Sequence, residues 1–129
     1  MIGIDTNVLV RYLVKDDPGQ SKKAAALFKS LTPKKKGFLS IVTIVETIWV
    51  LDSVYKVTTE SIKEVMLKLL SSRRLFVQCA DEVETALSSD AYAEDPAGAI
   101  IAEIGKAFGC EATVTFDKKA AELDGMRLL

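Results

Sequence analysis

The sequence contains no histidine among its 129 residues. This absence excludes a Ser-His-Asp triad, a zinc site with histidine ligands and proton transfer by an imidazole. A metal site in this chain would rest mostly on oxygen ligands, which suit Mg²⁺ or Mn²⁺. The carboxylates are therefore the side chains to follow along the sequence.

Cysteines and long apolar runs are also scarce. Cys79 and Cys110 stand in apolar surroundings without the spacing of metal ligands, so we expect reduced core residues of a cytoplasmic protein. No apolar run reaches the length of a membrane span, and the first residues lead into an expected strand instead of a basic signal sequence. We therefore expect no membrane partner.

Neither sign of charge is in excess. The net charge of −1 gives no global attraction for nucleic acid, so contact with a polyanion would need local basic patches or a bound cation. Apolar residues make up 49% of the chain and charged residues 27%, which is typical of a soluble domain. The length suffices for one domain with its own core, and we expect a single domain over residues 1–129.

Strand and helix patterns alternate along the chain. We expect short apolar strands at residues 2–4, 38–41, 75–77 and 112–116, with a last edge strand at 126–129. The first strand should be buried on both faces. Helices are expected at residues 7–13, 20–31, 43–55, 59–71, 81–92 and 95–108. This alternation predicts the α/β class with a mainly parallel central sheet.

Four acids stand at the ends of these elements. Asp5 and Asp117 each follow a strand, whereas Glu46 and Asp95 each stand near the start of a helix. If the sheet brings these edges together, four carboxylates converge in one cleft, where a divalent cation would relieve their repulsion. Such a site cleaves phosphodiesters by activating a water molecule. A phosphoacceptor domain, which also gathers acids around Mg²⁺, is disfavoured because Asp5 has no acidic neighbour.

Three of these acids also have a purely structural interpretation. Asp5 is a suitable cap for the following helix, and Asp95 is a good N-cap before a proline. Thr43 and Glu46 have the spacing of a capping box. Asp81 is the expected cap of the helix at residues 81–92. The individual segments do not decide between the two interpretations.

Three segments resemble the motifs of one known family. They read IGIDTNVLVR at residues 2–11, SIVTIVETIWVL at 40–51 and GCEATVTFDKKAA at 109–121. In this order they resemble the motifs of PIN-domain proteins, in particular VapC-type toxins of prokaryotic toxin–antitoxin pairs. The resemblance implies an α/β/α sandwich and an endoribonuclease that depends on Mg²⁺ or Mn²⁺. It also implies an RNA substrate such as tRNA or rRNA, a cognate antitoxin and a homodimer.

The resemblance assigns roles to individual residues. Asp5 and Glu46 would be metal ligands, and Asn7 would support Asp5 by hydrogen bonding. Asp117, with Thr115 nearby, would complete the site or position its water. Two further residues, Lys118 and Lys119, directly follow Asp117 and are candidates for phosphate contacts, although surface lysines are common.

The chain departs from the family pattern at its third acid. The family motif reads Asp-aromatic-Ala-Asp-Ala-Leu-Ile-Ala, and the matching residues 95–102 read DPAGAIIA. Gly98 therefore stands where the metal-facing aspartate is expected, although glycine costs roughly 0.5–1 kcal/mol in a helix relative to alanine. Asp95, three positions earlier, could take over as a catalytic metal ligand. Alternatively the site binds a single metal weakly, or the protein is a degenerate PIN-like module that binds RNA or a protein without cleavage.

Overall fold

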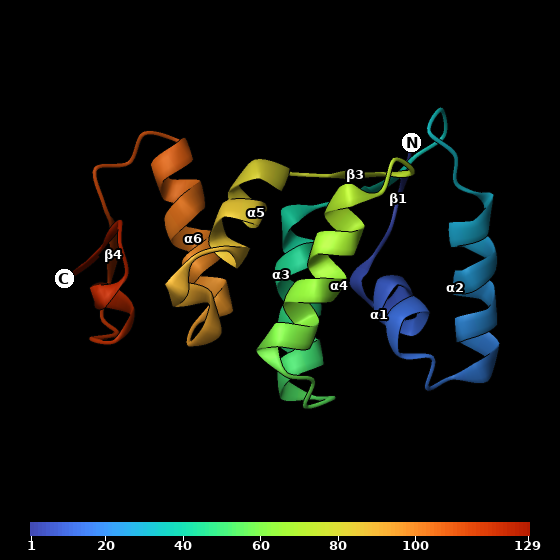
Figure 1. Ribbon diagram of the computed structural model, residues 1–129, viewed down its shortest axis with the longest axis horizontal. Helices are drawn as coiled ribbons and strands as arrows, with labels where there is room; N and C mark the ends of the chain where they lie inside the picture. Colours follow the sequence, from blue (N-terminus) through green and yellow to red (C-terminus); the bar gives the residue numbers. More distant parts are fainter. The chain divides into compact units, whose positions relative to one another are not determined.

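The computed structural model describes residues 1–129 (Figure 1). The chain falls into two compact units, an N-terminal unit (Met1–Gln78) and a C-terminal unit (Cys79–Leu129), and each is described on its own. All strand pairs are parallel, and the strands alternate with helices, which confirms the predicted α/β class. None of the helices combines the length and the apolar character needed to cross a bilayer.

The N-terminal unit is built on a three-stranded sheet in the order β1 (Ile2–Gly3), β2 (Gly37–Leu39) and β3 (Leu75–Val77). The register places Gly37 between Ile2 on one side and Leu75 on the other. A Cβ atom at Gly37 would lie 2.6 Å from Ile4 Cδ1 and 2.9 Å from Leu31 Cδ1. A side chain at position 37 would therefore have to displace the ends of these two apolar side chains.

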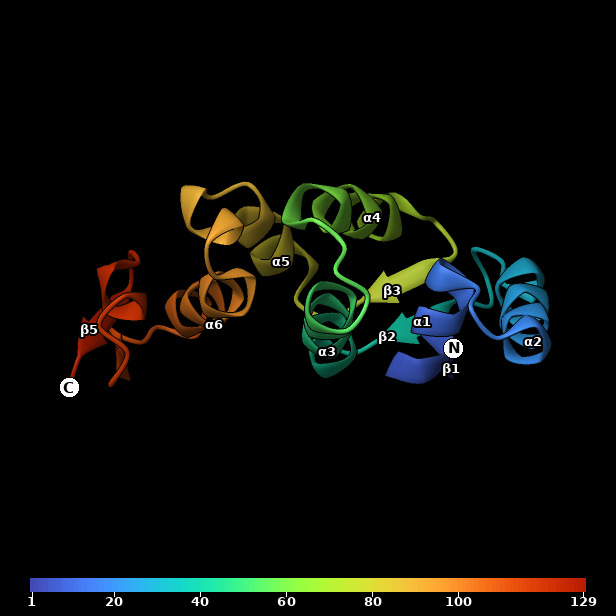
Figure 2. The ribbon, with the colours of Figure 1, turned by 90° about the horizontal axis from the view of Figure 1, so that it is seen from below.

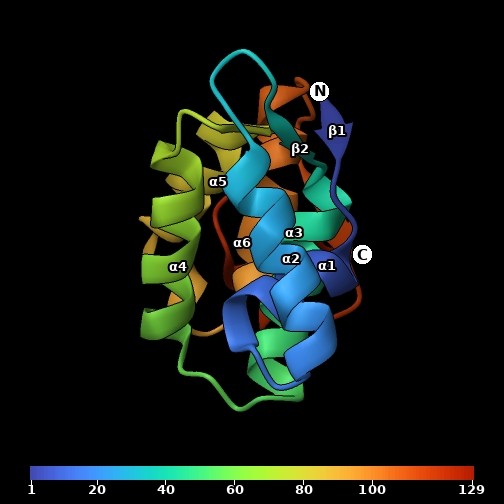
Figure 3. The same cartoon turned by 90° about the vertical axis from the view of Figure 1, so that its right-hand side faces the viewer.

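Four helices surround this sheet: α1 (Thr6–Val14), α2 (Pro18–Ser30), α3 (Ile41–Ser53) and α4 (Thr59–Ser71). α1 packs against α2 and α3, and α4 packs against α3 and β3. The pairing of α1 with α2 is visible in Figure 3. Fully buried apolar side chains from these elements form the core of the unit, including Leu9, Leu39, Ile44, Ile62 and Met66.

The C-terminal unit contains α5 (Ala80–Leu87), a 3-10 turn η1 (Asp90–Ala93) and α6 (Pro96–Ala107). They are followed by a two-stranded sheet of β4 (Thr113–Thr115) and β5 (Met126–Leu128), with a second 3-10 turn η2 (Ala120–Glu122) between the strands. α5 and α6 lie side by side (Figure 2). α6 ends at Ala107, and Gly109 follows with a φ of 79°, a left-handed conformation that favours glycine after a helix.

Several local expectations are wrong. β1 is the edge strand of its sheet, so Ile2 is 47% exposed and only the following Ile4 is buried. The helix expected at residues 81–92 ends at Leu87, and its N-cap position is occupied by Cys79 instead of Asp81. Cys110 is an exposed thiol and not a core residue.

Candidate functional site

Asp5 lies where the chain turns from β1 into α1. Its backbone occupies the N-cap position, and its carbonyl oxygen accepts hydrogen bonds from the amides of Val8 and Leu9, both at 3.1 Å. The side chain makes no capping hydrogen bond. The carboxylate forms no ion pair either, since the ion pairs of the structure involve other residues. The capping role that the sequence allowed for this carboxylate is therefore not realised.

Glu46 lies in the second turn of α3. The helix starts at Ile41, and its N-cap Ser40 accepts a hydrogen bond from the amide of Thr43 at 3.1 Å. The capping box expected from Thr43 and Glu46 is wrong, because Thr43 is already inside the helix and buried. The Glu46 carboxylate instead accepts a hydrogen bond from the Thr6 hydroxyl at 2.7 Å, which joins α3 to the start of α1.

Asp5 and Glu46 line one open hollow of about 380 Å³, here called the acid pocket. The other side chains that line it are Thr6, Asn7, Val10, Arg11, Val50, Val54 and Tyr55. Of the two neighbours of Asp5, it is Thr6 that hydrogen-bonds to a site acid, and Asn7 makes no hydrogen bond to Asp5. Both residues belong to the first motif, and only Asn7 was predicted to support the site.

Arg11 supplies a fixed positive charge on the wall of the acid pocket. Its Nε donates to Gln20 Oε1 at 2.8 Å, and its Nη1 donates to Tyr55 Oη at 3.1 Å and to Asp16 Oδ1 at 3.2 Å. The Tyr55 hydroxyl in turn donates to Asp16 Oδ2 at 2.7 Å. The guanidinium is therefore held by α2, by the loop after α1 and by the segment that follows α3.

This network shifts the pKa values of its members. The hydrogen bond from Tyr55 lowers the pKa of Asp16, and the charge of Arg11 lowers it further. The hydrogen bond with Tyr55 raises the pKa of Arg11, and donation to Asp16 raises the pKa of Tyr55. At neutral pH the network thus holds an ionised carboxylate and guanidinium beside a neutral phenol.

Asp95 is the N-cap of α6 in the C-terminal unit. Its Oδ1 accepts a hydrogen bond from the amide of Gly98 at 2.8 Å, as the structural interpretation predicted. A Cβ atom at Gly98 would overlap with Asp95 Oδ2 and would lie 2.6 Å from Asp95 Cγ. The carboxylate of Asp95 therefore lies in the space that a side chain at position 98 would need, and this gives the glycine a physical reason.

Asp117 follows β4 and organises the turn into η2. Its Oδ1 accepts hydrogen bonds from the amides of Lys119 and Ala120, at 2.8 and 3.1 Å, and its own amide donates to Thr115 Oγ1 at 3.1 Å. The side chains of Lys118 and Lys119 are exposed. Neither lysine takes part in an ion pair.

The predicted constellation is divided between the units. The N-terminal unit brings Asp5 and Glu46 together in the acid pocket, and Asp95 and Asp117 belong to the C-terminal unit. Neither unit by itself gathers three or more acidic or cysteine side chains that could hold a metal ion. Within the acid pocket the candidate metal ligands are the carboxylates of Asp5 and Glu46, the Thr6 hydroxyl and the Asn7 amide oxygen, all of them oxygens.

A family model described as the PIN domain matches residues 2–126. The chain belongs to the PIN domain family. The match extends over both compact units, and the helices and parallel sheets of this PIN domain agree with the α/β/α fold of the family. PIN domains are generally metal-dependent nucleases, and membership indicates nucleic-acid binding. No curated protein and no solved structure matches the chain closely enough to count as a relative.

Proposed function

We propose that this PIN domain is an endoribonuclease of the VapC type that depends on Mg²⁺ or Mn²⁺. The observation that carries the proposal is the free carboxylate of Asp5. An aspartate at an N-cap position ordinarily contributes about 1 kcal/mol by capping the helix, yet Asp5 makes no such bond and shares the acid pocket with Glu46. A local stabilising interaction given up in this way is typical of functional sites.

The donor set of the acid pocket fits a hard divalent cation. Two carboxylates in one hollow repel each other, and oxygen ligands are those that Mg²⁺ and Mn²⁺ prefer. Asp5 and Glu46 would hold the ion, and the 2.7 Å hydrogen bond from Thr6 would orient Glu46. The bound ion would neutralise charge on the RNA phosphate and make a water molecule more acidic. Arg11 would add a fixed positive charge for the same phosphate.

Asp95 and Asp117 are the further acids of the proposal. Asp95 would replace the aspartate that the family pattern places at position 98. Two facts support this role: its Oδ2 lies where a side chain at position 98 would begin, and only its Oδ1 is used by the helix cap. Asp117 likewise commits one oxygen, Oδ1, to the turn, and Thr115 holds the amide of Asp117. Asn7 would assist Asp5, and Lys118 and Lys119 would contact phosphate.

The remaining parts of the proposal rest on the three motifs and on family membership. We propose that residues 1–129 act as one domain in the cytoplasm, form a homodimer and are inhibited by a cognate antitoxin. The substrate would be a single-stranded or looped region of an RNA such as tRNA or rRNA. Expression of the chain in a bacterium should arrest growth, and the Asp5→Asn variant should not.

The direct test measures cleavage of a fluorescently labelled single-stranded RNA in the presence of Mn²⁺ or Mg²⁺. We expect Asp5→Asn and Glu46→Gln to lower the cleavage rate by more than about a hundredfold, beyond the usual effect of removing a group that only orients a ligand. The matched control is Asp52→Asn, because Asp52 is an exposed acid on the same helix as Glu46 and lies outside the acid pocket. The control should cleave like the unchanged chain.

Calorimetric titration with Mn²⁺ completes the test. The unchanged chain should bind the ion, and Asp5→Asn should bind it far more weakly. Full metal-dependent cleavage by Asp5→Asn would overturn the assignment. Metal binding without cleavage of any RNA would contradict the enzymatic proposal and indicate a binding module instead. The variants Asp95→Asn and Asp117→Asn decide in the same assay whether these two acids take part.

A further inference from the structure

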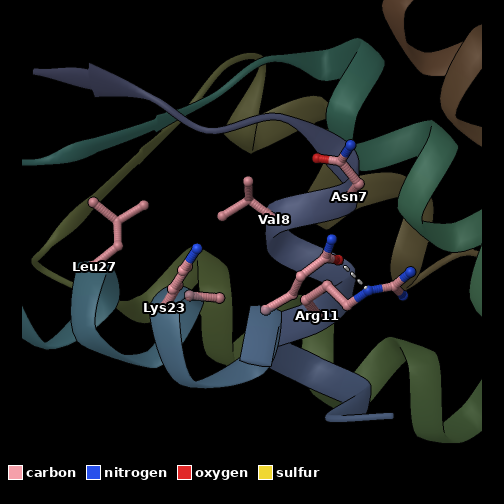
Figure 4. A pocket seen from close by; sticks show the side chains of 7 residues that line it. Asn7, Val8, Arg11, Lys23 and Leu27 are labelled. Carbon is pink, nitrogen blue, oxygen red and sulfur yellow. Dashed lines mark hydrogen bonds between the residues drawn. The ribbon is translucent and has the colours of Figure 1, made fainter. Parts of the chain in front are cut away.

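A second hollow lies between α1 and α2 in the N-terminal unit (Figure 4). Its volume is about 320 Å³, at the lower end of the range of about 300–1,000 Å³ typical of small-molecule sites. We call it the α1–α2 pocket. The side chains that line it are Asn7, Val8, Arg11, Gln20, Lys23, Ala24 and Leu27.

The pocket has an apolar part and a cationic part. Val8 of α1 and two α2 residues, Ala24 and Leu27, form the apolar part. Figure 4 shows Lys23 and Leu27 rising from α2 toward α1. Lys23 is exposed and belongs to no ion pair of the structure. Arg11 uses Nε and Nη1 within the protein and leaves Nη2 without a partner. Two cationic groups with unused donors therefore stand beside an apolar surface.

The pocket also offers two amide groups. Gln20 Oε1 accepts the hydrogen bond from Arg11, drawn as a dashed line in Figure 4, so that the Gln20 NH₂ group is left as a donor. Asn7 is exposed and uses neither end of its amide within the protein. Side-chain amides pair with the edges of bases, and single-stranded RNA exposes those edges because its bases can be splayed out.

The α1–α2 pocket adjoins the acid pocket. Asn7 and Arg11 line both hollows. A polymer whose phosphate lies in the acid pocket would therefore place a neighbouring unit in the α1–α2 pocket. A nucleotide has the matching chemistry, with a phosphate for the cations, an apolar base face for the aliphatic side chains and polar base edges for the amides.

We propose that the α1–α2 pocket holds the nucleotide next to the cleaved phosphate and selects its base. Lys23 binds the phosphate of this nucleotide, and Arg11 Nη2, on the wall shared by the two pockets, binds the cleaved phosphate beside it. Val8 and Leu27 contact the face of the base, and Asn7 and Gln20 read its edge. The inference rests on the proposed function, because it takes RNA as the substrate. The inference assigns the recognition of the RNA sequence to residues of α1 and α2.

The test measures binding, so it does not depend on cleavage. Fluorescence anisotropy of the full chain without added metal gives the affinity for four labelled homopolymers of equal length, one of each ribonucleotide. We expect Lys23→Ala to weaken all four complexes by about tenfold, the loss of one charge-assisted contact. The slope of log Kd against log salt should also fall by about 0.7. The matched control is Lys22→Ala, which removes an exposed charge from α2 outside the pocket and should leave the affinity unchanged.

The base preference supplies a second measurement. The unchanged chain should bind the four homopolymers with different affinities, and Asn7→Ala should reduce these differences more than it lowers the mean affinity. Equal effects of Lys22→Ala and Lys23→Ala, or no RNA binding at all, would overturn the inference. Effects confined to Lys23 in a chain that never cleaves RNA would support the pocket and refute the nuclease. Cleavage of RNA by a chain whose RNA affinity is unchanged by Lys23→Ala would support the nuclease and refute the pocket.

Discussion

Replacement of Gly98 by alanine should destabilise the protein slightly or leave its stability unchanged, although alanine is the better helix former. An added Cβ atom would overlap with Asp95 Oδ2 and lie 2.6 Å from Asp95 Cγ, so the capping carboxylate must move. If this movement breaks the hydrogen bond to the amide of residue 98, the loss of the cap costs about 1 kcal/mol; a carboxylate that turns and keeps the bond, as Asp17 does with Gln20, would leave the helix gain intact. The gain in helix propensity is about 0.5–1 kcal/mol. The net change in the free energy of unfolding is therefore a loss of about 0–0.5 kcal/mol.

The double variant Asp95→Ala/Gly98→Ala tests directly whether alanine at position 98 removes the cap. Asp95→Ala alone should cost about 1 kcal/mol, but it should cost almost nothing in the Gly98→Ala background, where the cap is already lost. The coupling free energy between the two positions should therefore be about 1 kcal/mol. Urea denaturation followed by circular dichroism gives all four free energies of unfolding.

α2 provides a control one position away. It also starts with a capping aspartate and a proline, Asp17 and Pro18, and its Gly19 stands one position before the capped amide of Gln20, where Ala97 stands in α6. A Cβ atom at Gly19 would lie 3.6 Å from Asp17 Oδ1, an ordinary contact, so Gly19→Ala should keep the cap and stabilise the protein by up to about 0.5–1 kcal/mol. Additive effects of Gly98→Ala and Asp95→Ala, with the full helix gain at position 98, would refute the steric account.

Two further predictions concern α3 and the Arg11 network. Thr47→Val should stabilise the protein by about 1 kcal/mol in urea denaturation, because the Thr47 hydroxyl is buried without a hydrogen-bond partner. Thr43→Val should destabilise the protein, because the Thr43 hydroxyl accepts a hydrogen bond from Ser40 Oγ. Equal effects of the two substitutions would contradict this explanation. The pKa of Asp16 is lowered, first by the hydrogen bond from Tyr55. Its charge therefore adds stability above the ordinary pKa of an aspartate, and this contribution disappears as the pH falls through the lowered value. The urea midpoints of the unchanged chain and Asp16→Asn should thus differ at neutral pH and converge in acid, and parallel curves would show that Asp16 is not responsible.

Local pattern was sufficient to predict most of the elements. The N-cap of α6 at Asp95 lies where the sequence places it, and α4 (Thr59–Ser71) has the expected bounds. β3 has the expected bounds. These features depend on residues within a few positions of one another, so that spacing and turn chemistry determine them. The start of α5 was not predicted, because its N-cap Cys79 has a left-handed backbone that is unusual for cysteine.

The candidate site was predicted only in part. The sequence placed Asp5 and Glu46 in one site, and the acid pocket contains both. It could not find Tyr55 or Gln20 as partners of Arg11, because those contacts join segments that are far apart in the chain. One indication was available for Arg11 itself, which stands four positions after Asn7 on a predicted helix and therefore on the same face. The sequence shows only that Gly98 departs from the family motif. The overlap between a Cβ atom at this position and the Asp95 carboxylate depends on atomic coordinates, so the sequence could not reveal it.

The hydrogen bonds of Arg11 have a consequence for the affinity with which this side chain binds an anion. A free arginine side chain loses about 2 kcal/mol of rotamer entropy when it is fixed in one conformation. Here folding has already fixed the guanidinium through Gln20, Asp16 and Tyr55. An arriving anion thus meets a preorganised donor, and binding requires little further ordering of this side chain. A lysine at position 11 would keep the charge and lose this advantage, because a flexible ammonium cannot form the same planar fork.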